Sequence, residues 1–123
     1  MLILVVEDEA PLREVLATIL IEAGYRVAAA PDGLAALALL RELPEPPQLI
    51  LLDLMLPHMT GVELCAALRR DPTFAAVPIL VLTAAAAHAG DMPALSGLRI
   101  LHKPITIDAL LAAIQQASLQ GAA

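Results

Sequence analysis

The chain has 123 residues, a formal net charge of −6 and one cysteine. This length predicts one domain with one core, the negative charge argues against a nucleic-acid-binding surface, and a lone cysteine excludes an internal disulfide. Apolar residues make up 59% of the sequence, but the longest apolar stretches, such as 77–87, are shorter than the roughly 20 residues that span a bilayer. The N-terminus lacks the basic flank of a signal peptide, so we expect a cytoplasmic protein without a membrane segment.

The first half of the chain alternates apolar runs with helical periodicity. Residues 2–6 are aliphatic without alternation, as is typical of a buried parallel strand. Apolar residues recur at helical spacing from Leu12 to Leu20, and Gly24 is the expected C-cap of that helix. Residues 25–30 predict a weak second strand, and a second helix is expected from Pro31-Asp32-Gly33 to just before Pro44.

The second half continues this alternation. Its predicted elements, in order, are a strand over 49–54, a loop over 56–61, a helix over 62–70, a strand over 79–82, a helix around 84–95, a strand over 99–102 and a helix beginning near 107. Gly90 and Pro93 disturb the helix expected around 84–95. The alternation predicts an α/β fold, a doubly wound five-stranded parallel sheet with five helices on both faces.

Polar side chains follow the predicted strands at widely separated places in the chain. Glu7 and Asp8 come directly after the first strand, and Asp53 lies at the end of the third. Thr83 and Lys103 follow the fourth and fifth strands. Because the carboxyl ends of parallel strands meet at one edge of a sheet, we expect these five side chains to lie close together.

These residue types together suit phosphoryl transfer. Adjacent carboxylates repel each other unless a cation joins them, and Mg²⁺ prefers such oxygen ligands and shares phosphate oxygens. Asp53 is the candidate nucleophile, which would form an acyl phosphate, while Thr83 and Lys103 would bind phosphoryl oxygens. A cis bond between Lys103 and Pro104 would aim the ammonium at the site. Taken alone, the acidic pair is more typical of a helix N-terminus than of a metal site.

Four segments of the chain resemble the receiver domain of two-component response regulators, and the resemblance runs from Met1 to about Leu119. The segments are Leu4 to Glu9, Asp53 to Gly61, Leu82-Thr83-Ala84 and Lys103-Pro104. The resemblance implies a flavodoxin-like fold with strand order 2-1-3-4-5. It also implies that residues 1–123 are a single receiver domain, with no effector domain in this chain.

The resemblance implies that Asp53 accepts a phosphoryl group from a histidine kinase or a histidine phosphotransfer protein. Thr83 and Lys103 would bind the phosphoryl oxygens, and Ala84 would leave room for the group to enter. The implied Mg²⁺ ligands are the carboxylates of Glu7, Asp8 and Asp53 and the backbone carbonyl of Met55.

Phosphorylation is implied to move Thr83 inward and to change the face formed by the fourth helix, the fifth strand and the last helix, which would bind a downstream protein. The switch position of the fifth strand, usually aromatic in the family, is Ile100 here. Gly61 and Pro104 are expected to be structural. Because the face has few charges, we expect no dimer held by salt bridges there, and predict a monomer or a weak dimer without direct nucleic-acid contact.

Three other interpretations stay open beside this signalling module, which we expect not to be an enzyme. One is a scaffold-type receiver that binds partners without phosphorylation. Another is a phosphatase with an aspartyl-phosphate intermediate, but such enzymes have a second acid two residues after the nucleophile, where this chain has Met55. A flavodoxin-like electron carrier is disfavoured, because the chain has no tryptophan and no hydroxyl-rich loop after the first strand.

Overall fold

The computed structural model describes residues 1–54, 56, 58–83 and 98–122. The elements in chain order are β1 (Leu2–Val6), α1 (Ala10–Glu22), β2 (Arg26–Ala30), α2 (Gly33–Glu42), β3 (Leu49–Leu52), α3 (Gly61–Arg70), β4 (Ile79–Thr83), β5 (Arg99–His102) and α4 (Ile107–Ala122). The five strands form one parallel sheet in the order β2-β1-β3-β4-β5, which confirms the predicted fold and strand order. The helix expected around 84–95 lies outside the described residues, which contain four helices.

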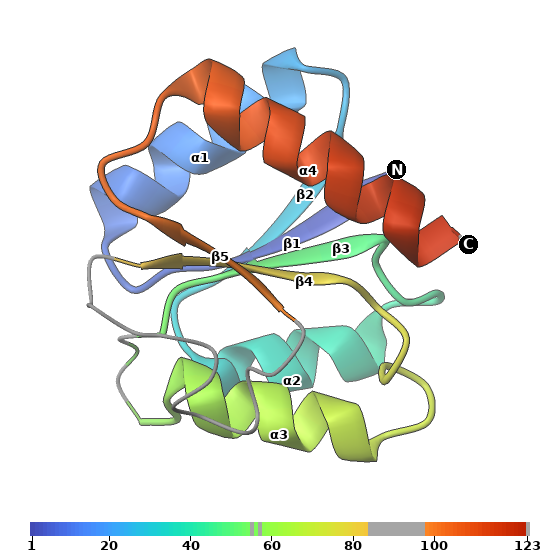
Figure 1. Ribbon diagram of the computed structural model, residues 1–123. Coiled ribbons are helices and arrows are strands. Elements are labelled where there is room, and N and C mark those ends of the chain that lie inside the picture. Colours follow the sequence, from blue (N-terminus) through green and yellow to red (C-terminus); the bar gives the residue numbers. More distant parts are fainter. Residues whose placement is uncertain (55, 57, 84–97, 123) are drawn as a thin grey trace.

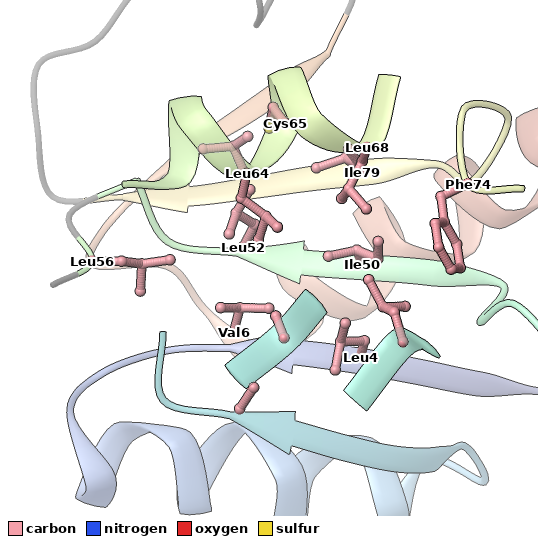
Figure 2. Close-up of a cluster of buried hydrophobic side chains, with 14 of the residues drawn as sticks. Leu4, Val6, Ile50, Leu52, Leu56, Leu64, Cys65, Leu68, Phe74 and Ile79 are labelled. Atoms are coloured by element: carbon pink, nitrogen blue, oxygen red, sulfur yellow. The ribbon is translucent and has the colours of Figure 1, made fainter. Parts of the chain in front are cut away.

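Helices cover both faces of the sheet, α1 and α4 on one side and α2 and α3 on the other (Figure 1). Each face has its own cluster of buried apolar side chains. Figure 2 shows the cluster beneath α2 and α3, where Leu64 and Leu68 of α3 point toward Leu52 and Ile50 of β3. None of the helices in the described part of the chain is long and apolar enough to cross a membrane.

Burial separates the central strands from the edge strands. Every residue of β3 and β4 is buried, and so is every residue of β1 after Leu2. The edge strands β2 and β5 are partly exposed, with buried Ala30 ending β2. Because helices cover both faces, the central strands are aliphatic without the alternation of a half-exposed sheet.

Among the element boundaries that differ from the sequence prediction are the ends of β3 and α1. β3 ends at Leu52, so Asp53 lies one residue beyond the strand, although its amide still donates to the Val6 carbonyl at 3.1 Å. Helix α1 is capped by Ala23, and Gly24 is the next residue, with φ of 100°. That left-handed conformation favours glycine. Gly24 therefore terminates the helix from the position directly after the C-cap, not as the C-cap itself.

Candidate functional site

Three carboxylates meet at the carboxyl edge of the sheet. Glu7 and Asp8 lie in the turn between β1 and α1, Asp53 lies directly after β3, and one oxygen from each is within 4.8 Å of the others. Glu7 and Asp53 are only 2% and 6% exposed, whereas Asp8 is exposed. Backbone bonds fix both buried acids, since the amide of Glu7 donates to Ala30 O and that of Asp53 to Val6 O, each at 3.1 Å.

Lys103 joins the two buried acids from the far end of the sequence. Its Nζ donates to Asp53 Oδ2 at 2.9 Å and to Glu7 Oε2 at 3.3 Å. The backbone amide of Lys103 donates to the Thr83 carbonyl at 2.9 Å, which continues the pairing of β5 with β4 past the strand end. The Lys103-Pro104 bond is cis, as the sequence hypothesis required.

Burial and charge set the protonation of this cluster. The pKa of Glu7 rises to about 7, first because the carboxyl is buried and then because Asp53 lies beside it as a hydrogen-bond partner and as a charge. Burial lowers the pKa of Lys103, but its bonds to Asp53 and the charges of both acids outweigh this effect, and the net pKa is raised. One ammonium therefore compensates the carboxylates only in part.

The donor set fits a divalent cation that prefers oxygen. Three carboxylates from two strand ends offer one oxygen each within a short span, and burial together with the neighbouring Asp53 raises the pKa of Glu7 to about 7. Mg²⁺ takes oxygen ligands and usually keeps several waters, so three protein carboxylates suit it. Met55, whose backbone carbonyl is the fourth predicted ligand, lies outside the described residues, as does Ala84.

Three further predicted residues, Thr83, Gly61 and Ile100, are among those that the structure describes. Thr83 is fully buried at the end of β4, opposite His102 of β5. Gly61 begins α3 so close to the acidic strand end that a Cβ there would lie 2.6 Å from the carbonyl oxygen of Asp53. Ile100 is half-buried, pairs with Val81 and packs against the cluster beneath α2 and α3. Its switch role stays a prediction.

Two polar contacts near the site were not predicted from the sequence. Arg13 of α1 donates through Nη1 to the backbone carbonyl of Glu7 at 2.8 Å. His58, with φ of 65°, pairs through Nδ1 with Asp32 Oδ2 at 3.2 Å, and Asp32 caps α2 by accepting from the amide of Ala35. An arginine one helical turn after an acidic turn is a usable signal for the first contact, but nothing in the local sequence links His58 to Asp32.

A parallel sheet in this order, with three carboxylates and a lysine at its carboxyl edge, is the arrangement expected of a receiver domain. The family model for the response regulator receiver domain matches residues 3–115, and the chain belongs to this family.

Individual relatives agree with this assignment. The DNA-binding response regulator MtrA of Mycolicibacterium paratuberculosis is 49% identical over 82 residues, and the regulatory protein PhoB of Pseudomonas aeruginosa is 45% identical over 82 residues; each match covers 67% of this chain. The match covers 34% of that MtrA and 35% of PhoB, so the chain spans about a third of the length of these relatives.

Solved structures show the same fold over nearly the whole chain. The chemotaxis response regulator CheY4 of Vibrio cholerae superimposes with a TM-score of 0.84 and 30% identity, covering 94% of this chain and 97% of CheY4. A receiver domain of a Syntrophus aciditrophicus histidine kinase gives a TM-score of 0.85 and 28% identity, covering 97% of this chain and 90% of that one. Receivers of this shape therefore occur in both regulators and kinases.

Proposed function

We propose that residues 1–123 form one receiver domain that accepts a phosphoryl group on Asp53 in the presence of Mg²⁺. The observation that carries this proposal is the convergence of Lys103 Nζ on the carboxylates of Asp53 and Glu7, at 2.9 and 3.3 Å, beside the third acid, Asp8. A histidine kinase or a histidine phosphotransfer protein is the proposed donor, as the family membership suggests.

In the proposed reaction, an oxygen of the Asp53 carboxylate attacks the phosphorus atom of the donor phosphohistidine. The bond from phosphorus to the imidazole nitrogen breaks, the electron pair stays with that nitrogen, and an acyl phosphate forms on Asp53. The ammonium of Lys103, already beside Asp53, would pair with an oxygen of the arriving group, and the hydroxyl of Thr83 would bind another. Mg²⁺ held by Glu7, Asp8 and Asp53 would supply neutralisation of the phosphoryl charge.

Intact mass after incubation with acetyl phosphate and MgCl₂ tests this proposal. Wild type is expected to gain one phosphoryl group, and Asp53→Asn is expected to gain none because its amide is a poor nucleophile. Removing the metal with EDTA should abolish the gain in wild type. A folded wild-type protein that gains nothing would contradict the proposal and favour a scaffold-type receiver that binds partners without phosphorylation.

The proposed output is a protein contact through β5, α4 and the segment between β4 and β5. MtrA is a DNA-binding regulator by name, but the match covers only about a third of it, and the −6 charge of this chain does not favour direct nucleic-acid contact. We further propose a cytoplasmic signalling module and not an enzyme with a separate substrate. Turnover of a simple phosphomonoester would overturn that last point.

A further inference from the structure

Arg13 is a cation at the rim of the acidic cluster that the proposed reaction does not use. It lies half-buried near the start of α1, and its Nη1 donates to the carbonyl oxygen of Glu7 at 2.8 Å and reaches that of Asp8 at 3.5 Å. The ion pairs found among the described residues join His58 to Asp32 and Lys103 to both buried acids. Arg13 therefore holds the backbone of the acidic turn and does not pair with its carboxylates.

The acidic turn needs such a restraint. Only Glu7, Asp8 and Glu9 connect β1 to α1, and three successive carboxylates repel one another. The side chain of Glu9 does not cap α1. A hydrogen bond from a charged guanidinium is about twice as strong as a neutral one, so it can fix the turn against this repulsion.

We propose that Arg13 is a positioning residue for the Mg²⁺ site: it holds the backbone of Glu7 and Asp8 so that their carboxylates meet the carboxylate of Asp53. This inference rests on the proposed function, because it gives Arg13 a role toward the ion that the function requires. It adds a side chain from a helix to a Mg²⁺ site whose three carboxylates directly follow strands β1 and β3.

Two effects of Arg13 on a bound cation have opposite signs. Its positive charge repels a nearby cation, so removing the charge alone would tighten Mg²⁺ binding. Its bond to the turn orders two ligands, so removing the bond would weaken Mg²⁺ binding. We expect the second effect to dominate, because the rim is solvated and salt screens the repulsion there.

The test is a titration of ¹⁵N-labelled protein with MgCl₂ at constant ionic strength, in which amide chemical shifts give the dissociation constant without any phosphorylation. The Arg13→Met variant is expected to bind Mg²⁺ roughly five- to twentyfold more weakly, the loss of about one charge-assisted hydrogen bond. Arg13→Lys, which keeps the charge and a donor, should recover most of the affinity. Arg26→Met is the matched control, since Arg26 is exposed and begins β2. It therefore lies at the amino ends of the strands, away from the carboxyl ends where the acids meet.

Each outcome of this titration has a definite meaning. Weaker binding in Arg13→Met alone, with recovery in Arg13→Lys and unchanged thermal unfolding of the metal-free protein, supports the positioning role. Equal or tighter binding in Arg13→Met overturns it, and so does an equal loss in Arg26→Met, which would make the effect one of net charge. Acetyl phosphate labelling of wild type reports separately on the proposed function, so failure of one is distinguishable from failure of the other.

Discussion

At the residue scale, the site is a balance among two buried acids, one exposed acid and one ammonium. Lys103 binds Glu7 and Asp53 together, yet the pKa of Glu7 still rises to about 7 because that carboxyl is buried beside Asp53. A carboxyl that titrates near neutral pH in the absence of metal will lose its proton when a cation binds. Metal binding and the protonation of Glu7 are therefore linked.

Glu7 should make the stability of the metal-free protein depend on pH. Its pKa of about 7 in the folded state exceeds the ordinary value of 4.5. Between these two pH values the folded state therefore binds more protons than the unfolded state, and the free energy of unfolding falls as pH rises from 4.5 to about 7. Glu7→Gln should remove this contribution and raise the free energy of unfolding above pH 7 by on the order of 1 kcal/mol.

Urea unfolding in EDTA, at pH values below 4.5 and above 7, measures this pH dependence of the free energy of unfolding. The matched control is Glu14→Gln, which changes an exposed acid on α1. Equal pH dependence in wild type and Glu7→Gln would show that Glu7 has the same pKa in the folded and unfolded states.

The sequence predicted those site residues whose location in space is determined by their position at the end of a strand. Glu7, Asp53 and Thr83 end or follow buried strands, so sheet topology alone predicted that they would meet. The contacts of Arg13 and His58 depend on side-chain reach and loop conformation, which strand periodicity does not report. The acidic cluster was thus predictable, and its restraints were not.

At the element scale, α3 begins against the acidic strand end. Thr60 and Glu63 form a capping box, in which each side chain accepts from the other residue's backbone amide. The amide of Gly61 donates to Leu54 O at 3.1 Å, and Gly61 has no room for a side chain. The start of α3 is therefore packed directly against the backbone of Asp53 and Leu54. This start was predicted to within one residue at Gly61, since turn residues mark it clearly.

Gly61→Ala should destabilise the fold because its methyl group would overlap the backbone of Asp53 and Leu54, at 2.6 Å from each. Overpacking of this kind costs about 1–3 kcal/mol, measurable by urea unfolding. The comparison variant is Gly24→Ala, where the neighbourhood is open and only φ of 100° opposes the side chain. Only Gly61→Ala should also lower phosphorylation of Asp53, and normal labelling of a folded Gly61→Ala protein would contradict the steric reading.

At the scale of the whole molecule, the described part of the proposed output face carries little charge. Asp108 lies in the first turn of α4, and Arg99 of β5 already donates to the amide oxygen of Gln116 on α4. The parallel sheet and its two helical layers followed from the alternation of elements, whereas the strand order came from the resemblance to receiver domains. The downstream partner cannot be predicted from the topology, because proteins with the same fold bind many different partners.

A domain with this face should not form a salt-bridged dimer when phosphorylated. We expect sedimentation velocity to show a monomer or a weakly associating dimer, with or without beryllofluoride as a phosphoryl mimic, and with little change between low and high salt. Arg99→Ala is the informative variant and should leave the association state unchanged. A tight dimer that dissociates at high salt would contradict this expectation.

The cation that bridges the two buried acids directly follows β5, one of the two edge strands of the sheet. Within the described residues β5 pairs only with β4, and its side chains are at least partly exposed. Segments with few buried apolar contacts and exposed backbone hydrogen bonds open at a lower free energy than core strands. A brief separation of β5 would carry the ammonium of Lys103 away from the carboxylates of Glu7 and Asp53. The electrostatic balance of the site therefore depends on the hydrogen bonds that hold β5 to β4 at one edge of the sheet.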